Sequence, residues 1–463
     1  MNFPNFLPIR IRTRLIALSA ALALTVAPCA QALDLIQSFR LALEQDARYQ
    51  SARADTQAVR ESAQGALAQM LPNVSSNLWR GHAQTNSQVP GQNGPVGNSY
   101  DYYSSTYGIS LHQAVYRKYS FAQYQQAKSQ VASAEATLDK NLQDMLVRLA
   151  GAYFDALMAG DQLDLIKGAK MAYAAQLQAM KRSFELGQGT RTDIDDAQAR
   201  YDMIVAQELE AAQNVDFTLR AVEVIINRPA GSLVRLDPAR LQLVAPMPAR
   251  IEDWIARGDE VSPDMRAARA NVESAAQELE KARSGHTPTV DLVLSRTRSQ
   301  SANDTTIHQT YLTNQVGLQV NIPIFSGGYV DAQERQALAN LEKYKQNYEV
   351  ARRDLGQQIR KEFRGVTEGV LKVKALEQAE RSSDQAVFSS QKGFQAGTRT
   401  LVDILNAEQQ RLNVRRDLAQ ARYAYIVARL RLQGLVNSLD ENELGTINGW
   451  LSAASTAEDS AAK

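Results

Sequence analysis

Mostly apolar positions recur at alternating spacings of three and four along two segments of the chain. The first series comprises Ile194, Ala197, Tyr201, Ile204, Glu208, Ala211, Val215, Thr218, Val222 and Ile225. The second comprises Leu138, Leu142, Met145, Leu149, Ala152 and Ala156. A repeat of about 3.5 residues is typical of a coiled-coil seam. Many seam positions are alanine, so we expect the neighbouring helices to pack closely.

Proline is missing from the segments that contain these seams. None occurs between Pro95 and Pro229, and none follows Pro323. Because proline breaks helix interiors, the sequence predicts uninterrupted helices over residues 119–186, 193–226, 330–396 and 403–437. At a rise of 1.5 Å per residue, each of the two longer helices would span about 100 Å. A globular core needs no helix of that length, so the pattern favours an elongated coiled coil.

Alternation of apolar and polar residues predicts four strands, over residues 73–85, 101–116, 288–298 and 310–325. The first strand alternates poorly and is assigned by the internal repeat described below. One face of the second strand would carry Tyr103, Ser105, Tyr107, Ile109, Leu111 and Val115. The corresponding faces in the second half would carry Val290, Leu292, Leu294, Leu312, Val316, Leu318, Val320 and Ile322. Polar loops at 86–99 and 301–308 would join each pair, and the alternation is typical of outer-membrane barrel strands.

A strand set that spans a membrane must close on itself, because open sheet edges cannot lie in lipid. The smallest outer-membrane barrels have eight strands, and one chain supplies four. Two chains would close a barrel filled by side chains, and three chains would enclose a wider lumen with twelve strands. The pattern therefore predicts an oligomer. A periplasmic antiparallel β-domain is an alternative, as is a plain coiled-coil rod, although a rod does not explain the strands.

The chain contains two copies of one plan. Phe184, Gly187, Asp193 and Ile194 recur with identical spacing as Phe394, Gly397, Asp403 and Ile404. We therefore divide the chain into a first repeat at 33–226, a connector at 227–262, a second repeat at 263–437 and a terminal segment at 438–463. Each repeat is expected to run helix, strand, strand, long helix, turn and helix.

The first residues have the pattern of a secretory signal peptide. A basic stretch precedes the apolar segment 15–27, which is too short to span a bilayer. Small residues then predict cleavage after Ala32, so the signal peptide is residues 1–32 and the mature chain begins at Leu33. The alternatives are an uncleaved membrane anchor and a lipid anchor on Cys29.

The composition and the missing motifs argue against a nucleic-acid-binding protein, a metal site and an enzyme. The 463 residues carry 51 basic and 50 acidic side chains, so no basic excess points to a nucleic-acid partner. Cys29 is the single cysteine, which excludes a disulfide framework and a four-cysteine zinc site. The chain has no G-x-x-x-x-G-K-[ST], H-E-x-x-H or G-x-S-x-G motif. Acidic pairs such as Asp161 and Asp164 fit a solvated helix face, so we expect no enzyme activity, cofactor or metal site.

Three segments resemble a known family. Residues 396–407 resemble the signature of TolC-type outer-membrane tunnel proteins, and residues 187–197 resemble its counterpart in the first repeat. Residues 322–328 are similar to the strand-to-helix junction of that family. The likeness extends in order over nearly the whole mature chain, which is therefore identified as a member of the TolC-type family.

The resemblance implies an α+β membrane protein that is a homotrimer. Three chains would build a twelve-stranded β-barrel, continued across the periplasm by a long α-helical coiled-coil barrel. The barrel would lie in the outer membrane of a Gram-negative bacterium, in contact with its lipid. The connector and the segment after Asn437 would form an equatorial belt, and the tail 452–463 would be disordered.

The implied function is that of a passive exit tunnel for type I protein secretion, drug efflux or both. The implied partners are a periplasmic adaptor and an inner-membrane transporter, which is either an ABC transporter or a proton-driven pump. We favour secretion. The alternative is a trimeric coiled-coil stalk, structural or adhesive, without transport activity.

The resemblance also assigns roles at the two helix-turn-helix tips. The docking residues for the adaptor would be Gly187, Gly189, Gly397 and Thr398. The gate would bond Arg399 and Phe394 on the second tip to Thr192 and Asp193 on the first. The family usually has tyrosine where Phe394 stands, so one hydroxyl bond is missing here and the latch should be weaker. Alternatively, Arg399 caps its helix and Phe394 packs within the tip.

Asp403 matches a family position whose carboxylate points into the lumen. Three copies would form an acidic ring that favours cations, and like-charge crowding would raise the pKa of these carboxylates. The family commonly places a second acid one turn further on, where this sequence has Asn406. Alternatively, Asp403 is the N-cap of a helix that starts near Ile404.

Overall fold

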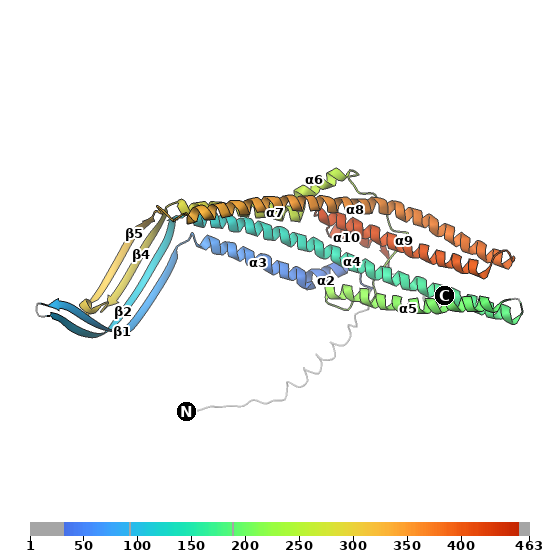
Figure 1. Cartoon of the computed structure of the whole chain (residues 1–463), viewed down its shortest axis with the longest axis horizontal. Helices are drawn as coiled ribbons and strands as arrows, with labels where there is room; N and C mark the ends of the chain where they lie inside the picture. The colour runs from blue at the N-terminus through green and yellow to red at the C-terminus, as the bar shows by residue number, and fades with distance from the viewer. Residues whose placement is uncertain (1–31, 92–93, 188, 453–463) are drawn as a thin grey trace, which may run out of the picture.

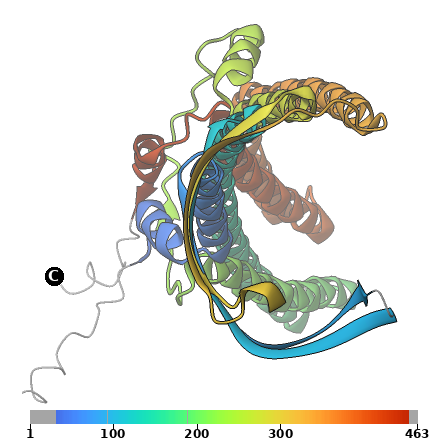
Figure 2. The ribbon, with the colours of Figure 1, turned by 90° about the vertical axis from the view of Figure 1, so that its left-hand side faces the viewer.

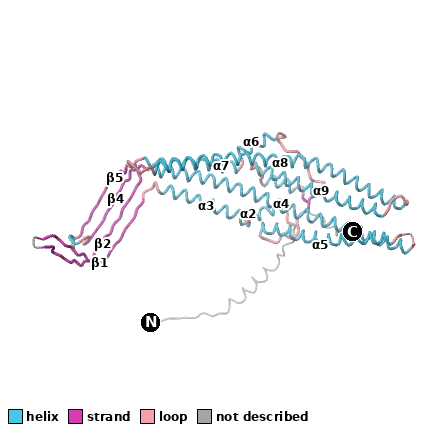
Figure 3. The backbone as a smooth tube through the Cα atoms, in the orientation of Figure 1, coloured by secondary structure: helices cyan, strands magenta, loops and turns pink. Residues whose placement is uncertain are grey.

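The computed structural model describes residues 32–91, 94–187 and 189–452. The predicted signal peptide lies outside the described residues except for Ala32, and so does the predicted disordered tail beyond residue 452. The described part is elongated, with a sheet at one end and long helices that run to the other end (Figure 1). Helices account for nearly all of the structure apart from that sheet (Figure 3).

Four antiparallel strands form the sheet, in the order β1-β2-β4-β5. Their bounds are β1 (Asn73–Gly91), β2 (Gly94–Tyr116), β4 (Thr289–Gln300) and β5 (Thr310–Asn321). Strands β1 and β5 are the edges, so each has one side without a strand partner among the described residues. The sheet curves in the manner of part of a barrel wall (Figure 2).

The register confirms that the predicted apolar residues share one face of the sheet, except Val115, which lies in a register shift, and Ile322, which follows β5. Val74 lies opposite Leu111, Leu111 opposite Leu294, and Leu294 opposite Val316. Residues directly opposite each other in an antiparallel pair point to the same side. Val74 and Val316 are 60% and 74% exposed. A row of large apolar side chains therefore crosses an exposed face.

The predicted loop at 86–99 was wrong. β1 continues to Gly91 and β2 starts at Gly94, so most of this segment belongs to a hairpin. The polar composition of the segment favours a loop, but β-structure depends on its partner strand more than on local preference.

Two details at the other end of the strands also differ from the prediction. β5 ends at Asn321, so residues 322–325 are not part of a strand. A register shift between Ala114 and Tyr116 sets Tyr116 opposite Val290. An extra residue in one strand changes the side to which the following residues point, which is why Tyr116 rather than Val115 lies opposite Val290.

The four long helices match the prediction within two residues at each end. α4 (Lys118–Glu185) and α8 (Tyr329–Gln395) run away from the sheet, and α5 (Arg191–Ile226) and α9 (Leu401–Leu435) return (Figure 1). The predicted seam residues Ala197, Ile204 and Ala211 are buried. Among the described residues, no helix combines the length and the apolar character that crossing a bilayer requires.

Shorter elements complete the fold. The helices are α2 (Leu35–Gln45), α3 (Ala47–Ala68), α6 (Ile251–Val261), α7 (Pro263–Arg283) and α10 (Glu441–Asn448), with 3-10 turns at Ser284–His286 and Asp304–Thr306. Strands β3 (Arg235–Leu236) and β6 (Leu451–Ser452) pair with each other. The element order from α2 to α5 recurs from α6 to α9, with β3 between the two series. The connector therefore contains a helix that the sequence did not predict, and the second series begins at Ile251 rather than at residue 263.

The largest hydrophobic core lies where the connector, the described N-terminus and the final helix meet the long helices. The fully buried Tyr153 of α4 places its hydroxyl 3.0 Å from the carbonyl oxygens of both Leu33 and Val234. The bridge between Leu33 and Leu233 lies beside it. These contacts tie the start of the described chain to the connector around the middle of the molecule.

Candidate gate at the helical tips

Each helical hairpin turns at a glycine in the left-handed conformation. Gly187 follows α4 with a φ of 72°, and Gly397 follows α8 with a φ of 74°. An L-residue with a side chain is destabilised by about 1–2 kcal/mol in this conformation, which explains glycine at both turns. A Cβ added at either position would meet no described atom within 4 Å apart from those of the adjacent residues. Both turns therefore face open space at the end farthest from the sheet (Figure 1).

Both return helices begin with the same capping box. In α5, the hydroxyl and the backbone N–H of Thr190 donate to Oδ2 of Asp193 at 2.7 and 3.1 Å. In α9, the hydroxyl and the backbone N–H of Thr400 donate to Oδ2 of Asp403 at 2.9 and 2.8 Å. In return, the backbone N–H groups of Asp193 and Asp403 donate to the threonine hydroxyls at 3.2 and 3.3 Å. Such reciprocal bonds satisfy polar groups at a helix start, so they determine where α5 and α9 begin.

Asp403 is thus held by its own turn. Thr400 is the N-cap and Asp403 is the third helical residue, so the alternative N-cap prediction put the cap three residues too late. Hydrogen bonds from the backbone and hydroxyl of Thr400, with the charge of Arg399, lower the pKa of Asp403. Within one protomer this is the reverse of the rise that we predicted, because these contacts stabilise the carboxylate.

The predicted latch is not formed within the protomer. Arg399, in the turn before α9, pairs instead with Asp403 in the first turn of that helix, with 3.7 Å between Nη1 and Oδ1. None of the ion pairs among the described residues joins Arg399 to Asp193. Phe394 is 36% exposed and Thr192 is exposed. Exposed ion pairs stabilise little, so Arg399 can exchange its partner at small cost.

The four predicted docking residues differ in their surroundings. Gly187 and Gly397 are open, whereas a Cβ at Gly189 would lie 3.2 Å from the backbone nitrogen of Phe184. The hydroxyl of Thr398 donates to the carbonyl of Gly393 at 3.1 Å. Gly189 and Thr398 therefore shape the turns, while Gly187 and Gly397 leave surface for a partner.

The start of α9 packs against the hairpin of α4 and α5. Leu401 and Leu405 are buried in a core whose other members include Tyr173, Ile194 and Ala197. The same contact brings Arg200 to Asn406, with 3.4 Å between Nη2 and Oδ1. Sequence reasoning missed Arg200, because the contact joins helices from different halves of the chain and no local pattern marks it.

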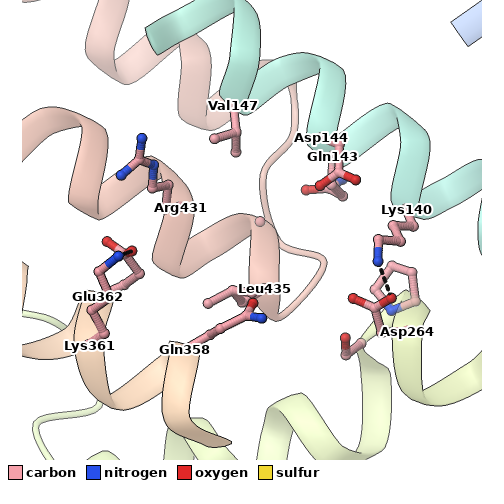
Figure 4. A pocket seen from close by; sticks show the side chains of 13 residues that line it. Lys140, Gln143, Asp144, Val147, Asp264, Gln358, Lys361, Glu362, Arg431 and Leu435 are labelled. Carbon is pink, nitrogen blue, oxygen red and sulfur yellow. Dashed lines mark hydrogen bonds and ion pairs between the residues drawn. The ribbon is translucent and has the colours of Figure 1, made fainter. Parts of the chain in front are cut away.

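A polar cavity of about 440 Å³ lies where the last turn of α9 approaches the first turn of α7 (Figure 4). Nζ of Lys140 lies 2.5 Å from Oδ1 of Asp264. Burial opposes the charge of Lys140, but the hydrogen bond to Asp264 raises its pKa overall. Burial raises the pKa of Asp144. The sequence did not predict this cavity, since its lining comes from four separate helices.

The charged residues of the lining balance one another. They are Lys140, Lys361, Arg431, Asp144, Asp264 and Glu362. Among the described residues, no group of three or more histidine, cysteine, aspartate or glutamate side chains is placed to hold a metal ion.

An exposed apolar sheet face joined to helices of this length is the fold of a chain of an outer-membrane channel. The chain belongs to the outer membrane efflux protein family, whose sequence profile matches residues 39–228 and 255–438. The TolC-type resemblance is thereby confirmed. The family is one of outer-membrane channels rather than enzymes.

Several proteins of this kind are similar over most of their length. Alkaline protease secretion protein AprF of Pseudomonas aeruginosa is 32% identical, over 89% of this chain and 86% of its own. Proteases secretion protein PrtF of Dickeya chrysanthemi is 28% identical over 96% of each chain. Outer membrane protein TolC of Escherichia coli is 26% identical over 91% of this chain and 86% of its own. The solved structure of VceC from Vibrio cholerae shows the same fold, with a TM-score of 0.77, 17% identity, and coverage of 88% of this chain and 97% of that one.

Proposed function

We propose that three copies of this chain form an outer-membrane exit tunnel that crosses the periplasm. The observation that carries the proposal is the sheet, whose exposed face is apolar and whose edge strands β1 and β5 each have one side without a strand partner among the described residues. Open edges cannot lie in lipid, so β5 of one copy pairs with β1 of the next until the wall closes. Three copies supply twelve strands around a lumen.

The helices continue the wall beyond the membrane. α4 and α8 contain 68 and 67 residues, and each is about 100 Å long. The connector and the segment around α10, joined by the pairing of β3 with β6, form the belt around the tunnel. The recurring element order and the two matches to the family profile support an internal repeat.

The tunnel is passive and receives its cargo from an inner-membrane transporter through a periplasmic adaptor. AprF and PrtF are named for the secretion of proteases, which supports type I secretion of a protein cargo with an ABC transporter. BepC of Brucella suis is named an outer membrane efflux protein, which supports efflux with a proton-driven pump as a second use of the same tunnel.

We assign the latch to contacts between neighbouring copies. Oδ2 of Asp193 is occupied by Thr190, whereas Oδ1 accepts no hydrogen bond from the described side chains. That oxygen is available to Arg399 of a neighbouring copy, which would give up an exposed pair and gain a charge-assisted bond. Thr192 and Phe394 flank the two charged groups on their respective tips.

The mouth of the tunnel carries two further roles. Asp403 contributes one carboxylate from each copy to an acidic ring. The bonds from Thr400 that lower the pKa of Asp403 within one chain oppose the rise that crowding in the ring would cause. The open turns at Gly187 and Gly397 receive the adaptor, while Gly189 and Thr398 maintain the shape of the turns.

Conductance of the purified protein in planar bilayers, beside its mass in detergent by light scattering, tests the proposal. We expect a trimer that inserts and conducts cations in preference to anions. An intact trimer that never conducts would identify a coiled-coil stalk instead and would refute the tunnel.

A further inference from the structure

Two arginines interrupt the exposed apolar face of the sheet. Arg298 of β4 lies opposite Tyr107 of β2 and opposite Leu312 of β5. Arg296 is two residues away on the same strand, so it points to the same side. Both side chains are exposed. Each arginine therefore lies among the side chains that face lipid in the proposed barrel.

The position of the arginines along the strands sets their depth. On the apolar face of β5, Leu312 is the large apolar residue nearest the hairpin end, and Val316, Leu318 and Val320 continue toward the helices. Arg298, opposite Leu312, lies at the outer rim of this band, and Arg296 lies about 7 Å further in along the strand. Arginine on a lipid-facing surface is tolerated far better near the interface than at the midplane. In the proposed tunnel this rim is the level of the outer leaflet headgroups.

The arginines have no counter-ion within the described chain. No ion pair or side-chain hydrogen bond among the described residues includes Arg296 or Arg298. Asp101 lies further out on the same face, and it pairs with His82. Arg80 of β1 adds a third cation to this face, two residues nearer the hairpin end of the sheet than the level of Arg298. The rim is therefore positively charged and lacks the anion that would neutralise it.

A depression of about 610 Å³ lies beside the two guanidinium groups. Its walls include Leu78, Tyr107, Ile109 and Leu312. Guanidinium groups bind phosphate oxygens through pairs of hydrogen bonds, and the walls offer apolar surface for a hydrocarbon chain. Free phosphate would leave those walls uncovered, whereas a phosphorylated lipid would occupy both parts of the depression.

We propose that Arg296 and Arg298 bind the phosphate group of an anionic phosphorylated lipid in the outer leaflet. The site rests on the proposed barrel, because the barrel turns this face toward lipid. All of its residues come from one chain, so a trimer carries three such sites. Acyl chains pack along Leu78, Ile109 and Leu312 below the headgroup.

The test measures lipid bound to the purified full-length trimer. Native mass spectrometry follows titrations with diphosphorylated lipid A, with zwitterionic phosphatidylcholine and with inorganic phosphate. We expect lipid A to bind the wild type and the double variant Arg296→Gln/Arg298→Gln to bind it roughly tenfold more weakly, since charge-assisted bonds are lost. The variant Arg296→Lys/Arg298→Lys should be intermediate, because lysine retains the charge without the paired geometry.

The matched control is Arg335→Gln/Arg353→Gln, which removes the same charge from two exposed positions of α8. It should bind lipid A as the wild type does. Equal lipid A binding by the two glutamine double variants would overturn the proposal. Binding of inorganic phosphate as tight as the binding of lipid A would also overturn it. Conductance is measured on the same samples. A wild type that forms no pore refutes the tunnel. Conducting trimers in which the Arg296 and Arg298 substitutions leave lipid A binding unchanged refute only the lipid site.

Discussion

The substitution Gly397→Leu tests whether the helical tips dock a partner. The left-handed φ of 74° at this turn makes any L-residue unfavourable, by about 1–2 kcal/mol. That strain is small beside the 5–15 kcal/mol by which proteins are typically stable, so the trimer should still assemble. The added Cβ lies more than 4 Å from the described atoms beyond the adjacent residues, so the substitution causes no steric clash at Cβ. We therefore attribute a larger defect to a contact outside the protomer.

Gly231 supplies a matched control. It has a φ of 60°, and its added Cβ also meets no atom within 4 Å, but it lies in the connector rather than at a tip. Gly231→Leu therefore introduces similar backbone strain and the same side chain at a position to which we assign no docking role. Gly397→Asn is a second comparison, because asparagine tolerates the left-handed conformation better than leucine does.

The assay measures exported protein in the medium of cells that contain the adaptor and transporter, together with trimers in isolated outer membranes. We expect Gly397→Leu to reduce export more than about tenfold, beyond the effect of the strain. Gly231→Leu should remain near the wild type, and both should retain trimers. Normal export by Gly397→Leu, or equal losses in the two leucine variants, would contradict docking at this turn.

Four further outcomes are expected. Arg399→Ser should raise the resting conductance severalfold by removing the latch, and an unchanged closed state would refute that role. Asp403→Ala should abolish cation selectivity and block by trivalent cations. Because the pKa of Asp403 is lowered, the wild-type block should persist as the pH falls through the range where carboxyl groups ordinarily titrate, and should vanish only at lower pH. Loss of the wild-type block already at neutral pH would argue against this ring. Asn406→Asp should strengthen that block fully only together with Arg200→Gln, since Arg200 lies 3.4 Å from Asn406; an equal gain in the single variant would show that Arg200 does not matter. Tyr153→Phe should lower the free energy of unfolding by about 0.5–1.5 kcal/mol, because the single hydroxyl proton that is shared between the carbonyls of Leu33 and Val234 is lost; denaturant titration with no change would contradict this.

The sequence by itself determined the elements that depend on local interactions. Heptad spacing and missing proline placed α4, α5, α8 and α9 within two residues, because helix hydrogen bonds and seam contacts join near neighbours in the chain. Alternation of apolar and polar residues identified the apolar face of the sheet, because successive side chains of a strand point to opposite faces. The helix start at Thr400 was misplaced because aspartate and threonine are both good N-caps, and only the geometry shows which residue occupies the cap.

Only the tertiary structure decided what depends on distant partners. The hairpin of β1 and β2 extends through a polar segment because ladder bonds to a paired strand outweigh weak local preference. Strand register set Arg298 opposite Leu312, and helix packing set Arg200 beside Asn406. Arg399 likewise bonds to Asp403 rather than to Asp193 in the protomer. Strand register and helix packing depend on contacts between segments that are far apart in the sequence, so the local sequence around a single residue does not determine them.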